Sequence, residues 1–195
     1  MSLLPVAGRR ALLLDRDGVI NVNHGYVHSK ENFDFVDGIF DLVRAACKAG
    51  YRVVVVTNQA GIGRGYYSEE QFYDLTDWMC AQFQKHGAPI DRVYFSPYHP
   101  TAGIGEYRKD EGTRKPGPGM ILRAKRELGL SLENSVLVGD KPSDILAGIT
   151  AGVRTNILFA NDAFAELAGL NYLTVRALKE VIPCLEGAVA ALAQR

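Results

Sequence analysis

Two aspartates separated by one residue, Asp15 and Asp17, come directly after the apolar segment 11–14. A short Leu-rich segment predicts a buried strand of a parallel sheet, and such sheets bind ligands outside the carboxyl ends of their strands. Aspartate is a poor strand residue and is costly to bury, so the pair needs a chemical reason to lie there. Ligation of a hard cation such as magnesium is the simplest reason, and an exposed Asp-Arg-Asp-Gly turn is the alternative.

Polar residues also end two other apolar segments, residues 52–56 and residues 135–138. The residues at these ends carry hydroxyl, amide, carboxylate or ammonium groups: Thr57, Asn58 and Gln59 after the first segment, and Asp140 and Lys141 after the second, with Asp144 one turn later. Each group alone has an ordinary explanation as a turn or a helix N-cap. Three buried strands ending in such residues at one edge of one sheet indicate a functional site.

Two cations, Arg114 and Lys115, precede Pro116 in a stretch without periodicity. Arg-Lys is often only a solvated surface pair. A cluster of carboxylates, however, is stable only around a bound cation, whereas Lys, Arg and hydroxyl or amide donors suit phosphate oxygens. Phosphoryl transfer uses both sets of groups. In such a reaction one Asp attacks phosphorus, and a second Asp protonates the leaving oxygen and then activates water.

Length and composition are consistent with one enzyme domain spanning residues 1–195. The 22 basic residues balance the 22 acidic ones, so nothing indicates a nucleic-acid or membrane partner. The three cysteines are far apart in sequence and are expected to be reduced. With no signal-like or membrane-spanning segment, we expect a cytoplasmic protein, and the neutral surface favours a monomer.

Along the chain, segments with the hydrophobic pattern of a helix alternate with segments that have the pattern of a strand. Helices are predicted at residues 39–49, 68–83, 118–128, 142–151 and 178–192, and strands at 11–14, 52–56, 93–95, 135–138, 155–159 and 172–175. Ser68 with Gln71 predicts a capping box, Gly50 ends the first helix, and prolines open the third and fourth. Right-handed crossovers then predict an α/β fold, a doubly wound parallel sheet with helices on both faces.

Four motifs resemble those of the haloacid dehalogenase (HAD) superfamily of phosphatases. They occupy residues 15–21, 56–59, 114–116 and 139–141. Segments 24–28, 32–33, 37–38, 57–65 and 114–120 further resemble the D-glycero-D-manno-heptose 1,7-bisphosphate 7-phosphatases, relatives of the histidinol-phosphate phosphatases. The resemblance spans roughly residues 11–160. It implies a Rossmann-like HAD fold and removal of the 7-phosphate of the heptose bisphosphate.

The resemblance also implies residue roles. Asp15 is the expected nucleophile and Asp17 the expected acid and base. Asp15, the backbone carbonyl of Asp17, and Asp140 are expected to hold magnesium. The expected phosphate- and substrate-binding residues are Thr57, Asn58, Gln59, Arg64, Arg114, Lys115, Asn21, His24 and Lys141. Among them, Arg114 is expected to reach the second phosphate or the hydroxyls. Lys141 stands where other superfamily members carry Asp, but it fits the subfamily.

Only about forty residues separate Asp15 from Thr57, so no separate cap domain is expected. Residues 96–114 lack periodicity over nineteen residues, which predicts a substrate-binding loop. Its counterpart in the family carries a zinc site of three cysteines and a histidine. The aligned positions here are Ser96, Tyr98, Glu111 and Thr113, so we expect no zinc and expect prolines and tyrosines to order the loop.

Three other functions remain open at this point. A receiver-like phosphoacceptor module also combines Asp, Thr, Lys and magnesium on a doubly wound sheet, but it carries its acidic pair and its acceptor Asp on different strands. A noncatalytic binding protein is disfavoured because all the residues needed for turnover are present. Hydrolysis of histidinol phosphate or another small sugar phosphate is the alternative within the enzyme class.

Overall fold

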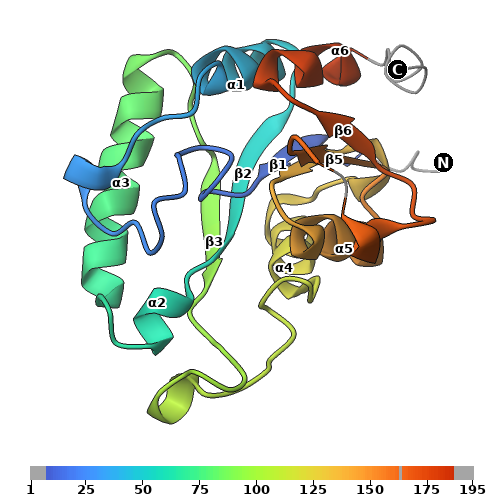
Figure 1. Cartoon of the computed structure of the whole chain (residues 1–195). Coiled ribbons are helices and arrows are strands. Elements are labelled where there is room, and N and C mark those ends of the chain that lie inside the picture. The colour runs from blue at the N-terminus through green and yellow to red at the C-terminus, as the bar shows by residue number, and fades with distance from the viewer. Residues whose placement is uncertain (1–7, 163, 187–195) are drawn as a thin grey trace, which may run out of the picture.

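In the computed structural model, which describes residues 8–162 and 164–186, six parallel strands form one twisted sheet (Figure 1). The strands are β1 (Ala11–Leu14), β2 (Arg52–Asn58), β3 (Arg92–Ser96), β4 (Val136–Gly139), β5 (Thr155–Phe159) and β6 (Leu173–Val175). They lie in the order β3-β2-β1-β4-β5-β6. The predicted α/β doubly wound parallel sheet is confirmed, and β2 runs two residues past its predicted end.

Successive side chains of β1 enter two different cores. Leu12 and Leu14 belong to the core on one face of the sheet, and Ala11 and Leu13 to the core on the other. The first face is covered by α1 (Ile39–Lys48), α3 (Glu69–Lys85) and α6 (Ile182–Leu185), and the second by α4 (Gly119–Leu128) and α5 (Pro142–Ala151). All four β1 residues are buried, because helices cover the strand on both faces. This explains why the strand is apolar at every position.

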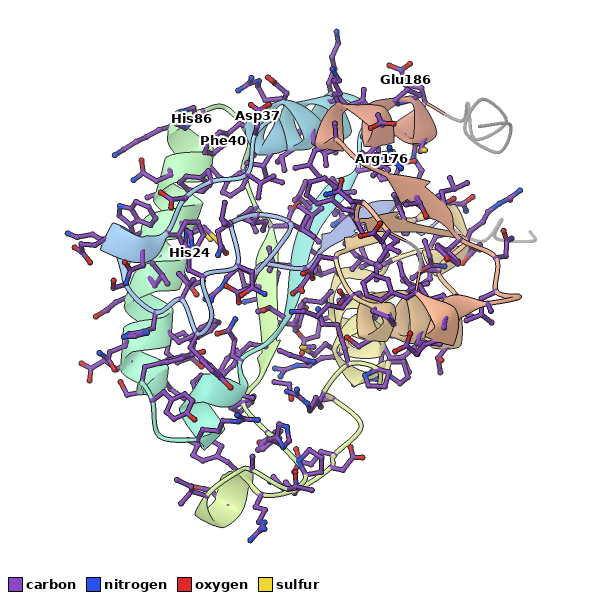
Figure 2. All side chains as sticks on the ribbon, in the orientation of Figure 1. His24, Asp37, Phe40, His86, Arg176 and Glu186 are labelled. Carbon is purple, nitrogen blue, oxygen red and sulfur yellow. The ribbon has the colours of Figure 1, made fainter. Side chains whose placement is uncertain are left out.

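Local signals set most of the helix ends. The Ser68 hydroxyl accepts from the Gln71 amide at 3.1 Å and the Gln71 side chain accepts from the Ser68 amide at 2.9 Å, which confirms the capping box of α3. At the other end of α3, His86 stacks on Phe40 of α1 with ring centroids 4.0 Å apart (Figure 2). Pro142 opens α5 as predicted, whereas Pro118 precedes the first turn of α4 as its N-cap.

The predicted helix 178–192 is not one continuous helix. The 3-10 turn η5 (Leu178–Val181) precedes the short α6, which carries Pro183 in its first turn. Proline has no amide hydrogen and its ring clashes with the carbonyl four residues earlier, so a regular helix cannot run through this position without a break. Positions 187–192 of that prediction lie outside the described residues. The short α2 (Ala60–Gly63) was not predicted, because four residues carry no periodicity.

Strand order reverses at β1, since the chain runs through β2 and β3 on one side and then through β4, β5 and β6 on the other. In such sheets the crevice at the reversal is the usual ligand site. The segment between β3 and α4, which contains the 3-10 turn η2 (Gly105–Tyr107), extends beyond α2 at the carboxyl end of the strands (Figure 1).

The three cysteines form no disulfide, as expected. Cys184 is buried, and Cys47 and Cys80 are partly exposed. Among the helices of the described ranges, none is both long and apolar enough to span a membrane.

Candidate active site

The carboxyl ends of β1, β2 and β4 meet at a cleft of about 510 Å³. Eight of the predicted site residues line it: Asp15, Asp17, Asn58, Gln59, Arg64, Arg114, Lys115 and Lys141. A larger hollow of about 730 Å³ lies at the opposite, amino ends of the strands, around the start of β4 and β5. None of the predicted site residues lines it. The chemistry predicted from the sequence therefore gathers in the smaller cleft.

Lys115 forms the centre of the cleft floor. Its Nζ lies 2.8 Å from Oδ1 of Asp15 and 2.6 Å from Oδ1 of Asp144, and it donates to the Val56 carbonyl at 2.8 Å. Burial opposes its charge, but the two carboxylates outweigh burial and raise the pKa of Lys115. The lysine is therefore a permanent cation with a fixed position.

Asn58 holds the backbone of Lys115 from the end of β2. Its Nδ2 donates to the Lys115 carbonyl at 2.9 Å, and its Oδ1 accepts from the Lys115 amide at 3.0 Å. This pair of bonds joins residues 57 positions apart in sequence. It fixes the segment before α4 against the sheet, so that the lysine side chain enters the cleft.

Three carboxylates form a cluster beside this lysine. Oxygens of Asp15, Asp140 and Asp144 all lie within 4.8 Å of one another. Burial and the charge of Asp15 raise the pKa of Asp140 to about 7. Burial likewise raises the pKa of Asp15, although Lys115 opposes that shift. One cation among three acidic groups leaves negative charge uncompensated.

Asp140 shows most directly that this cluster fits a hard cation. Its Oδ1 is buried and has no hydrogen-bond partner among the described residues, and Lys141 Nζ lies 3.8 Å from its Oδ2. Gly18, at φ 104°, makes room for this carboxylate, because a Cβ at that position would overlap it. An all-oxygen donor set with an unpaired buried oxygen is suited to magnesium.

Asp17 lies apart from the carboxylate cluster and is surrounded by donors. Arg16 Nε and Nη2 donate to its carboxylate at 3.2 and 2.8 Å, Asn21 Nδ2 at 3.1 Å and Gln59 Nε2 at 2.9 Å. The Arg16 side chain is only 1% exposed and also donates to the Val27 carbonyl at 2.6 Å. The orientation of Asp17 is thus set by neighbours from the two segments that follow β1 and β2.

The outer part of the cleft carries two arginines, Arg64 and Arg114. Burial and the positive charge of Arg64 lower the pKa of Arg114. Arg64 Nη1 donates to the hydroxyl of Tyr26 at 2.7 Å, and Arg64 Nε is buried with no partner among the described residues. Two neighbouring guanidinium groups favour an anion between them.

Four of the predicted site residues do not line the cleft: Asn21, His24, Thr57 and Asp140. Asn21 and Thr57 are buried beneath it, where Thr57 accepts from Gln59 at 2.9 Å. His24, labelled in Figure 2 on the segment between β1 and α1, lies 2.8 Å from the exposed Asp34 carboxylate. A substrate role for His24 stays a prediction without a supporting contact here.

The long loop at residues 96–114 is held by contacts at its base and along its length. At its base, Ser96 Oγ lies 3.2 Å from Thr113 Oγ1. Lys109 Nζ lies 4.5 Å from the centre of the Tyr98 ring and 2.5 Å from Glu111. Further contacts attach the loop to the helical side, since the Ile104 amide donates to the Gly63 carbonyl at 2.7 Å and Tyr107 donates to Glu69 at 3.1 Å.

Three residues that line the cleft, and one buried behind Asp17, were given no role from the sequence: Tyr26, Tyr67 and Asp144 in the cleft, and Arg16 behind it. Asp144 was recognised only as a nearby carboxylate, and it is 2% exposed against Lys115. Arg16, between the two aspartates, carried a signal, because a charge so close to a buried strand needs a partner. Tyr26 and Tyr67 gave no signal, since their places in the cleft depend on packing between distant segments.

Comparison with known proteins agrees with this geometry. A family model described as HAD-hydrolase-like matches residues 112–175. The D-glycero-alpha-D-manno-heptose-1,7-bisphosphate 7-phosphatase of Burkholderia mallei is 55% identical over 178 residues, which cover 91% of this chain and 94% of the relative. The D-glycero-beta-D-manno-heptose-1,7-bisphosphate 7-phosphatase of Vibrio cholerae is 49% identical over 148 residues, covering 76% and 80%.

Among solved structures, the D,D-heptose 1,7-bisphosphate phosphatase from B. bronchiseptica, complexed with magnesium and phosphate, superposes with a TM-score of 0.78. It is 26% identical and covers 91% of this chain and 98% of its own. The sequence identity, the parallel sheet and the acidic cleft all lead to one assignment. The chain belongs to the heptose-bisphosphate phosphatase family of the HAD-like hydrolases.

Proposed function

We propose that this protein is a magnesium-dependent phosphatase that removes the 7-phosphate of D-glycero-D-manno-heptose 1,7-bisphosphate through an aspartyl-phosphate intermediate. The observation that carries the proposal is the contact of Lys115 with Asp15 in the cleft, 2.8 Å from its Oδ1. It joins a nucleophile to a phosphate-binding cation. The similarity to heptose-1,7-bisphosphate 7-phosphatases supports this substrate over histidinol phosphate, and supports an enzyme over a receiver-like module.

Asp15 is the proposed nucleophile. In the described part of the chain, Oδ1 of this carboxylate accepts a hydrogen bond from the Arg16 amide at 2.7 Å. The same oxygen forms the ion pair with Lys115. Oδ2 is therefore the oxygen for attack on phosphorus. As it forms the new O–P bond, the bond to the sugar oxygen breaks, and Lys115 stabilises the negative charge on the phosphoryl oxygens.

Asp17 is the proposed general acid and base. It donates a proton to the departing sugar oxygen, then takes a proton from the water that hydrolyses the aspartyl phosphate. Both steps need the carboxylate aimed at one place beside the phosphorus. Arg16, Asn21 and Gln59 hold it in one orientation, which serves that requirement.

Asp15, Asp140 and the backbone carbonyl of Asp17 are the proposed magnesium ligands. The unpaired Oδ1 of Asp140 supports this assignment, and Asp144 lies in the same carboxylate cluster. When bound, the cation neutralises the carboxylates and polarises the phosphoryl oxygens. We also propose that Arg64 and Arg114 bind the second phosphate, with Lys141 at the cleft edge and Thr57 and Asn58 ordering the floor.

We further propose that residues 1–195 act as one catalytic domain, in the cytoplasm and as a monomer. The absence of net charge supports a small-molecule substrate without a nucleic-acid or membrane partner.

A phosphate-release panel tests the proposed function. It compares both anomers of the heptose bisphosphate with fructose 1,6-bisphosphate and histidinol phosphate, and phosphorus NMR identifies which phosphate remains. We expect the highest kcat/KM on a heptose bisphosphate, with the phosphate on carbon 1 retained. A higher kcat/KM on histidinol phosphate, or loss of the 1-phosphate first, would refute the proposed substrate. Including both anomers also decides which of the two the enzyme prefers.

A further inference from the structure

Tyr67 is a buried tyrosine at the inner wall of the cleft, on the segment between α2 and α3. Its hydroxyl donates to Oε1 of Gln59 at 2.5 Å, and its ring stacks on His28 with centroids 5.1 Å apart. Gly61 has no side chain where the ring passes, and a Cβ there would overlap the ring. The hydroxyl is therefore held at one place, facing Gln59.

Gln59 is only 1% exposed, and all its polar atoms are engaged. Its Nε2 donates to Asp17 Oδ2 and to Thr57 Oγ1, both at 2.9 Å, while Oε1 accepts from Tyr67. An amide turned the other way would place Oε1 against the Asp17 carboxylate, where two acceptors repel. The Tyr67 hydroxyl favours the productive orientation, because a donor at this position pairs with oxygen.

We propose that Tyr67 is a positioning residue, which acts through Gln59 to hold Asp17 in the orientation for proton transfer. The inference rests on the proposed function, in which Asp17 serves as the acid. Gln59, expected from the sequence to bind substrate, then serves the general acid instead. The Tyr67 hydroxyl and Asp17 are bridged by one amide, so loss of the hydroxyl removes one of the three hydrogen bonds that hold this amide and loosens its hold on Asp17.

Two substrates with different leaving groups distinguish a positioning role from a purely structural one. A structural defect should lower kcat/KM on both substrates alike, whereas a positioning defect should affect only the substrate whose leaving group needs a proton. A sugar oxygen leaves only as it gains a proton, whereas a nitrophenolate leaves without one. The value of kcat/KM reports the steps up to departure of the leaving group. We therefore expect Tyr67→Phe to lower kcat/KM for the heptose bisphosphate about 10-fold, the worth of one lost hydrogen bond, and to leave p-nitrophenyl phosphate within about twofold.

Three further variants complete the experiment. Asp17→Asn should show the same selectivity with a larger loss. Gln59→Leu removes the bridge, so Tyr67→Phe in that background should cost nothing more, as expected for residues acting through one contact. Tyr94→Phe is the matched control, because it removes a comparable tyrosine hydrogen bond, to Glu127 at 2.9 Å, outside the cleft, and it should leave both substrates unchanged.

Thermal unfolding confirms that each variant is folded before its rates are compared. Equal losses on both substrates, or additive losses in the double variant, would overturn the role of Tyr67 while leaving the phosphatase assignment intact. Failure of the unaltered protein to release phosphate from either substrate would instead refute the proposed function, and the positioning role with it.

Discussion

The ammonium of Lys115 lies 2.8 Å from the carboxylate of Asp15, and both side chains are almost fully buried. Lys115→Met would leave Asp15 and Asp144 buried without their cation. We expect the free energy of unfolding, measured in urea without magnesium, to fall by about 3–5 kcal/mol. Added magnesium should restore part of it, because a cation again compensates the carboxylates.

Lys109 provides the control for that variant. It forms an exposed ion pair with Glu111. Exposed pairs contribute little, so Lys109→Met should leave the free energy of unfolding almost unchanged. Equal effects of the two substitutions would contradict the role given to Lys115.

The paired aspartates should differ in their importance. Asp15→Asn removes the proposed nucleophile, so no turnover is expected, whereas Asp17→Asn should lose roughly 10²- to 10⁴-fold in kcat, the usual contribution of general acid and base catalysis. Steady-state phosphate release measures both. Comparable residual turnover in the two variants would rule out a covalent intermediate on Asp15.

Activity should require a small divalent cation. Three carboxylates with oxygens within 4.8 Å of one another would repel both each other and an incoming phosphate. Chelation should therefore abolish phosphate release, and magnesium should restore it. Calcium should inhibit, because its larger radius and higher coordination number distort the geometry that magnesium imposes. Full activity in excess chelator would disprove this requirement.

The loop at residues 96–114 should fold without zinc. It contains one histidine and no cysteine, and Nδ1 of His99 already accepts from the Ala102 amide at 3.0 Å. Metal analysis of protein purified without added zinc should find well below one equivalent, since a structural zinc site needs four ligands. A zinc-selective chelator should leave the magnesium-supported rate unchanged. One tightly held zinc in this loop would refute the prediction.

Tyr67 should make stability depend on alkaline pH. Burial raises the pKa of its hydroxyl to about 12, above the value of about 10 in an unfolded chain. The folded state keeps this proton while the unfolded state loses it, so the contribution is complete below about pH 10 and declines toward pH 12. Between pH 9 and pH 11, the melting temperature should therefore fall further in the unaltered protein than in Tyr67→Phe. An identical fall in both would show that the hydroxyl is not buried in solution.

Much of the scaffold could be predicted because its signals are local. The segment 11–14 is apolar at every position, which only a strand covered on both faces requires. Ser68 and Gln71 set the start of α3 through bonds between residues three apart. The C-terminal helix failed as a prediction because periodicity continued across Pro183 while the backbone could not.

The sequence by itself determined the parallel sheet, the succession of helices and strands along the chain, and the motif residues proposed to carry the chemistry, because apolar periodicity and strand ends act over a few residues. Only the tertiary structure decided how those residues meet. It placed Asp144 against Lys115 and Tyr67 against Gln59. Neither contact leaves a pattern in the chain, since each depends on the packing of segments whose relative positions are set by the whole folded core.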